Sequence, residues 1–374
     1  MGTITRGLAN SITTGGKVVS TSLSGNVAAS NVNNESLDSV TAFDSSLGDF
    51  VETTASDVSA GPTTRGQIFY NTSDGVLKGV RLLAAAWSSG GNMNTARGGT
   101  NNAAGDKTAG VTFGGQAPPG RSNATEEYDG TSWTSVTNTP AARRSYLVTG
   151  TQTASLLCGG QPPTPTANGD AETYEYDGSS FTETSDINSQ RDNAAGAGTQ
   201  TAGLAIGGRT RPGSTFVPNA NVEEYNGSTW TTANAMPANN ASSSSATGPQ
   251  TAAVFATAKP AHVAAYDGTN WTAITATQQI PDSYGGTGVA GTSSSDVYMG
   301  GGEEPGGTRH GVVQKYDGTS WTTQPSFSVA RNSFGYTGTS PAQLICGGQG
   351  DPGYVASTEE FTVATDSVKT ITTS

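Results

Sequence analysis

Short apolar runs recur along the chain from about residue 80 onward, and most of them end at a pair of glycines. The runs are Gly110–Phe113, Ser155–Cys158, Gly203–Ile206 and Gln343–Cys346. Apolar runs this short, bounded by turn residues, are typical of buried strands, and no apolar pattern at helical spacing accompanies them. The pattern therefore predicts an all-β chain built from short strands.

A second element follows each glycine pair: an aromatic residue, Asp-Gly or Asn-Gly, two further residues, then tryptophan or phenylalanine. The complete examples are Tyr128–Trp133, Tyr176–Phe181, Tyr225–Trp230, Tyr266–Trp271 and Tyr316–Trp321. Glycine takes positive φ without steric cost, so each example predicts a tight hairpin between two strands. The units recur at roughly 40 to 50 residues, which indicates a propeller or solenoid.

The first and last units are incomplete in complementary ways. Trp87 has no Tyr-Asp-Gly before it, and Phe361 has no tryptophan after it. Pairing the two in space completes one unit, with Leu82–Trp87 as the fourth strand beside Phe361. We therefore expect a six-bladed ring of four-stranded sheets closed by an N-terminal strand. Seven blades stay possible if Gln67–Arg81 adds further strand.

The repeated glycine pair, tyrosine and tryptophan resemble the kelch family of β-propellers over about residues 80–365. An arginine also precedes four of the glycine pairs: Arg97, Arg143, Arg191 and Arg331. In kelch-type repeats this position usually links strand ends through hydrogen bonds. Two units depart from the pattern, with Ala241 and Tyr284 at the arginine position and Thr257-Ala258 in place of one glycine pair. The resemblance implies a kelch-like propeller in which these two blades are less regular.

Composition narrows the classes of partner. The net charge of −12 argues against nucleic acid, whose phosphates require Lys and Arg, and against anionic membrane surfaces. No apolar run approaches the roughly 20 residues of a membrane-spanning helix, so we expect no membrane insertion. Cys158 and Cys346 precede glycine pairs in units that are not neighbours. We expect two buried thiols and no disulfide.

Catalysis is disfavoured by the residues present. The chain shows no phosphate-binding loop, nucleophile elbow or metal-ligand spacing, and its two histidines, His262 and His310, fall on loops of different units. The repeated acid pairs, such as Glu126-Glu127, are interpreted as blade-edge residues and not as general acid/base pairs. Arg144 and the four arginines before the glycine pairs could form a basic cluster for a carboxylate or phosphate, although a structural role is favoured. We expect no enzyme, no cofactor and no metal.

The segment before the repeats differs from them in composition. Residues 1–78 carry no repeat and are rich in Ser, Thr, Asn, Ala and Gly, a composition that buries little apolar surface. We divide the chain into an N-terminal attachment arm, 1–78, with a short β-hairpin module, and a propeller, 79–374. The phrase Gly66–Gly79 resembles the hairpin module found before the distal domain in appendage proteins of tailed, especially marine, bacteriophages. The opening Gly2–Asn10 resembles the starts of such proteins.

This second resemblance implies a virion structural protein, assembled in the host cytoplasm. The arm would bind other virion proteins, and the propeller would face host-surface glycans or neighbouring subunits, in a homo-oligomeric or multi-copy arrangement. The expected place is a tail appendage or fibre. A capsid decoration or vertex spike, a carbohydrate-binding lectin and a glycan-active enzyme stay open as alternatives.

The loops that follow the glycine pairs vary most in length and should share one face of the ring. They are Gln116–Asn123, Gln161–Ala171, Arg209–Asn221, Gly302–Gly311 and Gln349–Ser357. Loops on a rigid scaffold are where recognition usually resides. The candidate contact residues on them are Arg121, Arg209, Arg211, Phe216, Glu303, Glu304, His310, Asp351 and Tyr354.

Overall fold

The computed structural model describes residues 52–99, 103–163, 169–210, 215, 217–237, 245–258, 261–276, 287–293, 295–304 and 306–371. Every regular element within these ranges is a β-strand. The chain divides into two compact units. The larger unit is Ala86–Thr362, and the smaller unit combines the residues up to Ala85 with those from Val363 onward.

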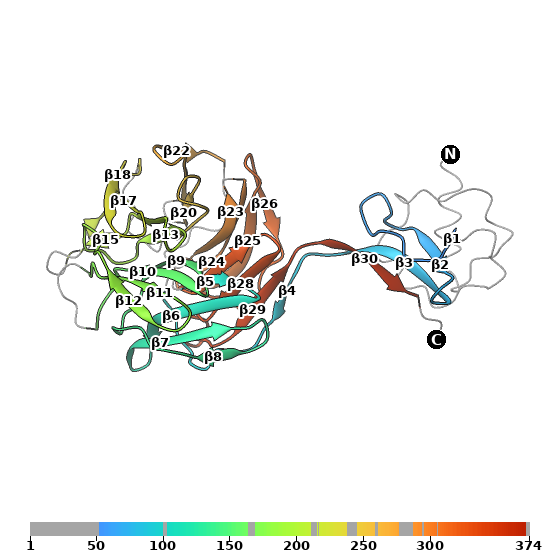
Figure 1. The fold of residues 1–374 in the computed structure, drawn as a ribbon, viewed down its shortest axis with the longest axis horizontal. Coiled ribbons are helices and arrows are strands. Elements are labelled where there is room, and N and C mark those ends of the chain that lie inside the picture. Colours follow the sequence, from blue (N-terminus) through green and yellow to red (C-terminus); the bar gives the residue numbers. More distant parts are fainter. Residues whose placement is uncertain are drawn as a thin grey trace. The chain divides into compact units, whose positions relative to one another are not determined.

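The first three sheets of the larger unit each contain four antiparallel strands (Figure 1). Sheet 1 is formed by β5 (Ala103–Asp106), β6 (Ala109–Ala117), β7 (Gly120–Tyr128) and β8 (Trp133–Ser135). Sheet 2 is formed by β9 (Leu147–Thr151), β10 (Ala154–Cys158), β11 (Thr173–Tyr176) and β12 (Phe181–Thr184). Sheet 3 is formed by β13 (Ala195–Gly198), β14 (Gly203–Ile206), β17 (Val222–Tyr225) and β18 (Trp230–Ala233). A two-stranded ribbon, β15 (Arg209–Thr210) with β16 (Val217–Pro218), lies in the loop between β14 and β17.

Three further four-stranded sheets follow the same plan. Sheet 4 is formed by β19 (Ser245–Thr247), β20 (Val254–Ala258), β21 (Ala261–Tyr266) and β22 (Trp271–Ile274). Sheet 5 is formed by β23 (Gly288–Ser293), β24 (Asp296–Glu303), β25 (Arg309–Tyr316) and β26 (Trp321–Gln324). Sheet 6 is formed by β27 (Gly335–Thr339), β28 (Ala342–Cys346), β29 (Thr358–Thr362) and β4 (Ala86–Ser89).

The first strands of the six sheets are neighbours in chain order. Strand β5 contacts β9, and the contacts continue through β13, β19 and β23 to β27, which in turn contacts β5. Successive sheets therefore share an inner layer of strands while their fourth strands lie at the outer edge of each sheet. The all-β, propeller-like fold is as the repeat predicted.

The pairing of the two incomplete units is confirmed, with a shift in the strand. Phe361 lies opposite Trp87 in sheet 6, and their ring centroids are 5.1 Å apart. Strand β4 begins at Ala86, later than the predicted start at Leu82, because Leu82 pairs with Asp366 in the smaller unit. The closing strand of sheet 6 thus comes from the start of the larger unit (Figure 1).

The smaller unit is a mixed four-stranded sheet in the order β1, β2, β3 and β30. Its strands are β1 (Glu52–Thr54), β2 (Ile68–Asn71), β3 (Val76–Leu83) and β30 (Thr365–Thr370). Strands β2 and β3 form the hairpin expected in Gly66–Gly79. The predicted boundary after residue 78 falls inside β3, and β30 pairs with β3, so the last described strand belongs with this unit and not with the propeller.

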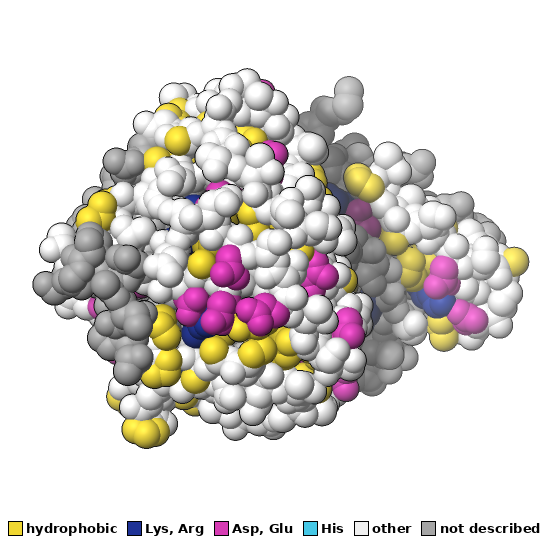
Figure 2. Space-filling model, turned by 60° about the vertical axis from the view of Figure 1, so that its left-hand side comes forward, with side chains coloured by type: hydrophobic (Ala, Val, Ile, Leu, Met, Phe, Trp, Pro, Cys, Tyr) yellow, Lys and Arg dark blue, Asp and Glu magenta, His cyan; other side chains and the backbone are white. Residues whose placement is uncertain are grey.

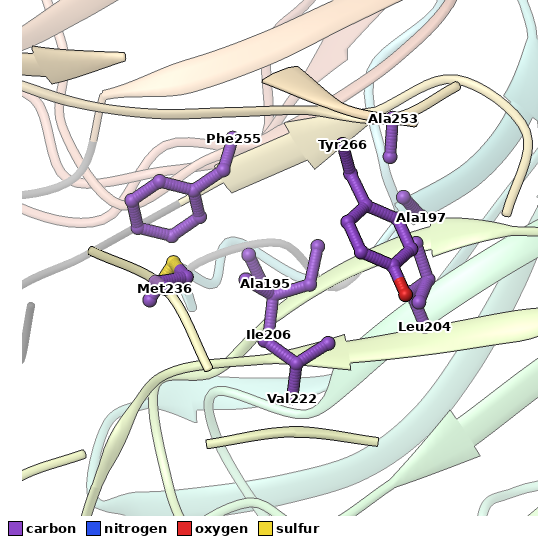
Figure 3. Close-up of a cluster of buried hydrophobic side chains, with 9 residues drawn as sticks. All are labelled: Ala195, Ala197, Leu204, Ile206, Val222, Met236, Ala253, Phe255 and Tyr266. Atoms are coloured by element: carbon purple, nitrogen blue, oxygen red, sulfur yellow. The ribbon is translucent and has the colours of Figure 1, made fainter. Parts of the chain in front are cut away.

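Apolar side chains of the larger unit pack as thin layers between adjacent sheets. In Figure 3, Phe255 and Tyr266 of sheet 4 lie against Leu204, Ile206 and Val222 of sheet 3. All five are at most 3% exposed. Such layers need few apolar residues, which explains how a chain only 33% hydrophobic builds this unit.

The glycine pairs permit close approach of the next sheet. Gly159 and Gly160 have φ of +64° and +93°, and a Cβ on Gly159 would lie 2.8 Å from the carbonyl oxygen of Arg191. An L side chain is disfavoured there by both backbone conformation and space. The glycine pair therefore lets the chain turn where the next sheet lies close to it.

The two cysteines precede such pairs, and both are free, buried thiols, as predicted. Burial raises the pKa of Cys346 to about 12 and also raises the pKa of Cys158. Because the thiolate is the reactive form, we expect neither residue to react with Ellman's reagent at pH 8 in the folded protein. Both should react in denaturant. Rapid reaction of one thiol without unfolding would contradict the burial described here.

Candidate functional site

Buried arginines at the repeated position hold sheets 1, 3 and 6 together from inside. Arg97, Arg191 and Arg331 are each at most 1% exposed. Each forms an ion pair with the first acid of the repeated pair in its own sheet: Glu126, Glu223 and Glu359, respectively. The guanidinium of Arg331 also donates to the carbonyl oxygens of Gly347 and Ser357, both at 2.9 Å. The structural role predicted for these arginines is confirmed.

These first acids are not blade-edge residues. Glu126, Glu223 and Glu359 are 0%, 1% and 2% exposed. The prediction was wrong for them because the aromatic repeat shows where a strand lies but not which of two adjacent acids points inward. A buried carboxylate needs a cation, and the arginine supplies it.

The second acid of each pair connects neighbouring sheets. The hydroxyl of Tyr176 in sheet 2 donates to Glu127 in sheet 1 at 2.8 Å, and that of Tyr266 in sheet 4 donates to Glu224 in sheet 3 at 2.7 Å. Tyr225 donates to Glu175 at 2.8 Å in the same manner. Tyr128 in sheet 1 donates to Glu360 in sheet 6, across the junction between the last and first sheets. The repeated tyrosine thus links neighbouring sheets in these four cases, whereas the hydroxyl of Tyr316 in sheet 5 donates to the carbonyl oxygen of Gly318 in its own turn.

The linking tyrosines should make the folded protein less stable at alkaline pH. Burial first, and then the hydrogen bond to a carboxylate, raise the pKa of Tyr128, Tyr176 and Tyr266 above the ordinary value of 10. A folded-state pKa above the unfolded value stabilises the fold fully below pH 10, and that contribution is lost as the pH rises above 10. We expect the urea midpoint to fall steadily from pH 10 to pH 12. A variant with all three residues changed to Phe should show a smaller fall, and an equal fall would contradict this assignment.

A polar pocket lies where the first strands of sheets 1, 2, 3 and 6 begin. Its volume is about 230 Å³. The larger side chains that line it are Gln116, Arg144, Asn193, Arg209, Gln349 and Tyr354. A second cavity, of about 520 Å³, is lined by the other ends of the first strands and by the turns that follow them, where Gly, Ala and Thr predominate. The smaller pocket therefore gathers the polar groups that can recognise a ligand.

Three residues at this pocket have a left-handed backbone without being glycine. Ser145, Asn193 and Ser333 have φ of +56°, +55° and +52°. Asparagine tolerates this conformation, whereas serine is held there at a cost of roughly 1–2 kcal/mol. Strained positions of this kind cluster at functional sites. Three of them meet at one pocket, which singles it out among the cavities of the described residues.

The two arginines in the pocket differ in their partners. The Nε of Arg209 lies 2.5 Å from Oδ1 of Asp192, which is 1% exposed, so this guanidinium is neutralised locally. The Nε of Arg144 donates to the amide oxygen of Gln161 at 2.6 Å, a neutral partner. In the described part of the chain no carboxylate forms an ion pair with Arg144. Among the residues that the structure describes, the pocket therefore carries one positive charge without a carboxylate partner.

Two of the predicted contact residues, Arg209 and Tyr354, lie in this pocket. The ring of Tyr354 packs on the backbone of Gly98, where a Cβ would lie 3.0 Å from ring carbons. Arg211 and Phe216 fall outside the described residues, as do Ala241 and Tyr284. The sequence indicated Arg144 only as one member of a wider basic cluster. The other members, Arg97, Arg143, Arg191 and Arg331, are buried in ion pairs.

The other predicted contact residues lie outside this pocket, and most of them form hydrogen bonds or ion pairs with nearby segments. The guanidinium of Arg121 donates to the carbonyl oxygen of Pro162. Glu303 accepts a hydrogen bond from Asn332, and Asp351 forms an ion pair with Arg309. The Glu304 backbone closes a short turn with Thr308. The prediction that both histidines fall on loops was wrong, because His310 lies in β25 and His262 lies in β21. His310 is only 8% exposed, since this strand continues into the segment that was expected to be a loop.

The outer surface contrasts with the pocket. The face of the larger unit seen in Figure 2 carries a group of acidic side chains and little exposed Lys or Arg, in keeping with the net charge of −12.

Within the described residues no group of three or more His, Cys, Asp or Glu is placed to hold a metal ion. The same residues include no helix long and apolar enough to cross a membrane.

Comparison with known proteins supports the fold. No family model matches the chain, and no curated protein matches it. The solved structure of a protein named YjhT is similar, with a TM-score of 0.59 and 14% sequence identity. The match covers 74% of this chain and 99% of YjhT. At this level of identity the likeness concerns the fold alone, which is all-β and propeller-like.

Proposed function

We propose that the larger unit is a closed, six-bladed, kelch-like β-propeller. The contact of β27 with β5 and the hydrogen bond from Tyr128 to Glu360 support a ring without a gap between sheets 6 and 1. The pairing of β4 with β29 supports closure by a strand from the opposite end of the unit. Such a ring is a rigid scaffold for the loops after the glycine pairs.

We further propose that the chain is a non-enzymatic virion structural protein, a tail appendage or fibre component. The N-terminal part anchors it to other virion proteins, and the propeller is displayed toward the host surface or a neighbouring subunit. The observation that carries this proposal is the phrase Gly66–Gly79, which resembles phage appendage modules and forms the β2–β3 hairpin of a separate compact unit.

Connectivity also suits a displayed domain. The chain enters the larger unit at Ala86 and leaves it at Thr362, and these two residues lie opposite each other in the pairing of β4 with β29. Both connections therefore leave one sheet at one place. The other five sheets have no direct connection to the smaller unit.

Localisation in intact particles tests the proposal. Antibodies raised against residues 86–362 should label gradient-purified virions at the tail in immunogold micrographs. In a complementation assay, the full chain should enter particles, whereas residues 86–362 alone should not. Absence of the full chain from purified particles would overturn the virion assignment, and incorporation of residues 86–362 alone would overturn the anchoring role of the smaller unit. Labelling at capsid vertices would replace the tail assignment by a capsid spike.

A further inference from the structure

We propose that the polar pocket at the start of the first strands binds one acidic sugar unit, with Arg144 holding the sugar carboxylate. The inference rests on the proposed function for its biological meaning, since a displayed pocket of this kind would contact a surface polysaccharide. Its physical basis lies in the pocket itself: the charge of Arg144, the neutral polar groups around it, the ring of Tyr354 and the size of the space.

Arg144 is the charged group available to a ligand. Its Nε is held by Gln161 at 2.6 Å, and its backbone pairs with that of Gln161, so the side chain is positioned without being neutralised. A guanidinium presents several donors in a fixed plane, which suits the two oxygens of a carboxylate. On a protein with a net charge of −12, such a local cation favours the binding of an anion here.

The neutral groups of the pocket match hydroxyls. Gln116 and Gln349 line the space, and an amide side chain carries both donors and an acceptor. The Gln116 amide nitrogen donates to the carbonyl oxygen of Gly120 at 2.9 Å, which orients its oxygen. A simple inorganic anion would use few of these groups, whereas a sugar hydroxyl both donates and accepts hydrogen bonds.

Tyr354 and the pocket volume limit the size of the ligand. The ring of Tyr354, fixed on the backbone of Gly98, provides an apolar face for the C–H face of a pyranose. The volume of about 230 Å³ is below the roughly 300–1,000 Å³ that is typical of drug-sized ligands. One sugar ring fits this size better than a folded peptide segment does.

The backbone conformation around the pocket also favours a binding site. Ser145 and Ser333 retain a left-handed conformation that glycine would adopt more cheaply, and Asn193 shares it. They lie just before the first strands of sheets 2, 3 and 6, around the same pocket as Arg144. Strain kept at three convergent positions is consistent with a shape required by a ligand.

Titration of the full chain tests the proposal, with D-glucuronate, D-glucose and acetate as probes and saturation-transfer NMR as the readout. D-Glucuronate should bind at least roughly tenfold more tightly than either of the others, because only it supplies both the carboxylate and the hydroxyls. Equal binding of glucose would overturn the role of charge. Equal binding of acetate would overturn the sugar assignment, and no binding of glucuronate would overturn the site.

Two arginine variants complete the test. Arg144→Gln should weaken glucuronate binding roughly tenfold or more and leave glucose binding unchanged. Arg309→Gln is the matched control, because Arg309 pairs with Asp351 outside the pocket, and it should bind glucuronate as the native chain does. Equal loss in both variants would overturn the assignment to Arg144. Binding without presence in virions would refute the proposed function alone, and presence in virions without binding would refute this inference alone.

Discussion

Replacing Arg331 by alanine is expected to lower the free energy of unfolding by about 3–5 kcal/mol. The change leaves Glu359, which is 2% exposed, without its cation, and it removes the donors to the carbonyl oxygens of Gly347 and Ser357. Backbone N–H groups of Ser328 and Val329 still reach the carboxylate but cannot neutralise it. Urea unfolding followed by tryptophan fluorescence measures the loss.

Two further variants separate the causes of that loss. The double change Arg331→Met with Glu359→Leu removes both charges, so it should recover part of the stability that the single change loses. Arg309→Ala removes an arginine whose partner Asp351 is largely exposed, and it should cost at most about 1 kcal/mol. If Arg331→Ala were as mild as Arg309→Ala, the buried pairs would not be the internal supports described above.

The change Gly198→Ala is expected to cost about 3 kcal/mol or to prevent folding. Gly198 ends the first strand of sheet 3 with φ of +96°, and a Cβ there would lie 2.1 Å from the carbonyl oxygen of Ala202. That oxygen belongs to the backbone and cannot move aside without distorting the turn. The unfolding midpoint in urea measures the effect.

Gly120→Ala is the matched control for Gly198→Ala. No atom lies within 4 Å of a Cβ placed on Gly120, so the same chemical change should alter the unfolding free energy by about 0.5 kcal/mol or less. Similar losses in the two variants would show that the close approach at Gly198 does not decide the outcome.

Much of the fold could be predicted because its determinants are local and repeated. The Asp-Gly turns, the aromatic residues beside them and the glycine pairs each specify a short piece of strand or turn. The positive φ of a second glycine series, near the ends of the first strands of the six sheets, was not predicted. The series is Gly105, Gly150, Gly198, Gly248, Gly291 and Gly338. The recurring phrase Gly-Thr-Gln-Thr-Ala at Gly150 and Gly198 was a usable signal for it. The pairing of β30 with β3 had no local signal, since it joins segments from opposite ends of the chain.

The candidate site was predicted only in part. The rule that long loops carry recognition led to Arg209 and Tyr354, which do lie in the pocket. It missed Ser145, Asn193 and Ser333, because their importance comes from a backbone conformation that composition does not reveal. Each of the three stands two residues after the repeated arginine of its unit, which is Arg143, Arg191 or Arg331. A fixed offset from a repeated residue was the signal available for them.

The origin of the closing strand has a consequence for biosynthesis. Strand β4 leaves the ribosome early, yet its partner β29 begins only at Thr358. At about 5–20 residues per second, Trp87 waits on the order of tens of seconds for Phe361 to be translated. During that time a nascent chain exposes an unpaired strand, which a neighbouring chain on the same messenger RNA could accept into its own sheet 6. Slow translation or crowded polysomes should therefore favour strand-swapped dimers over monomers.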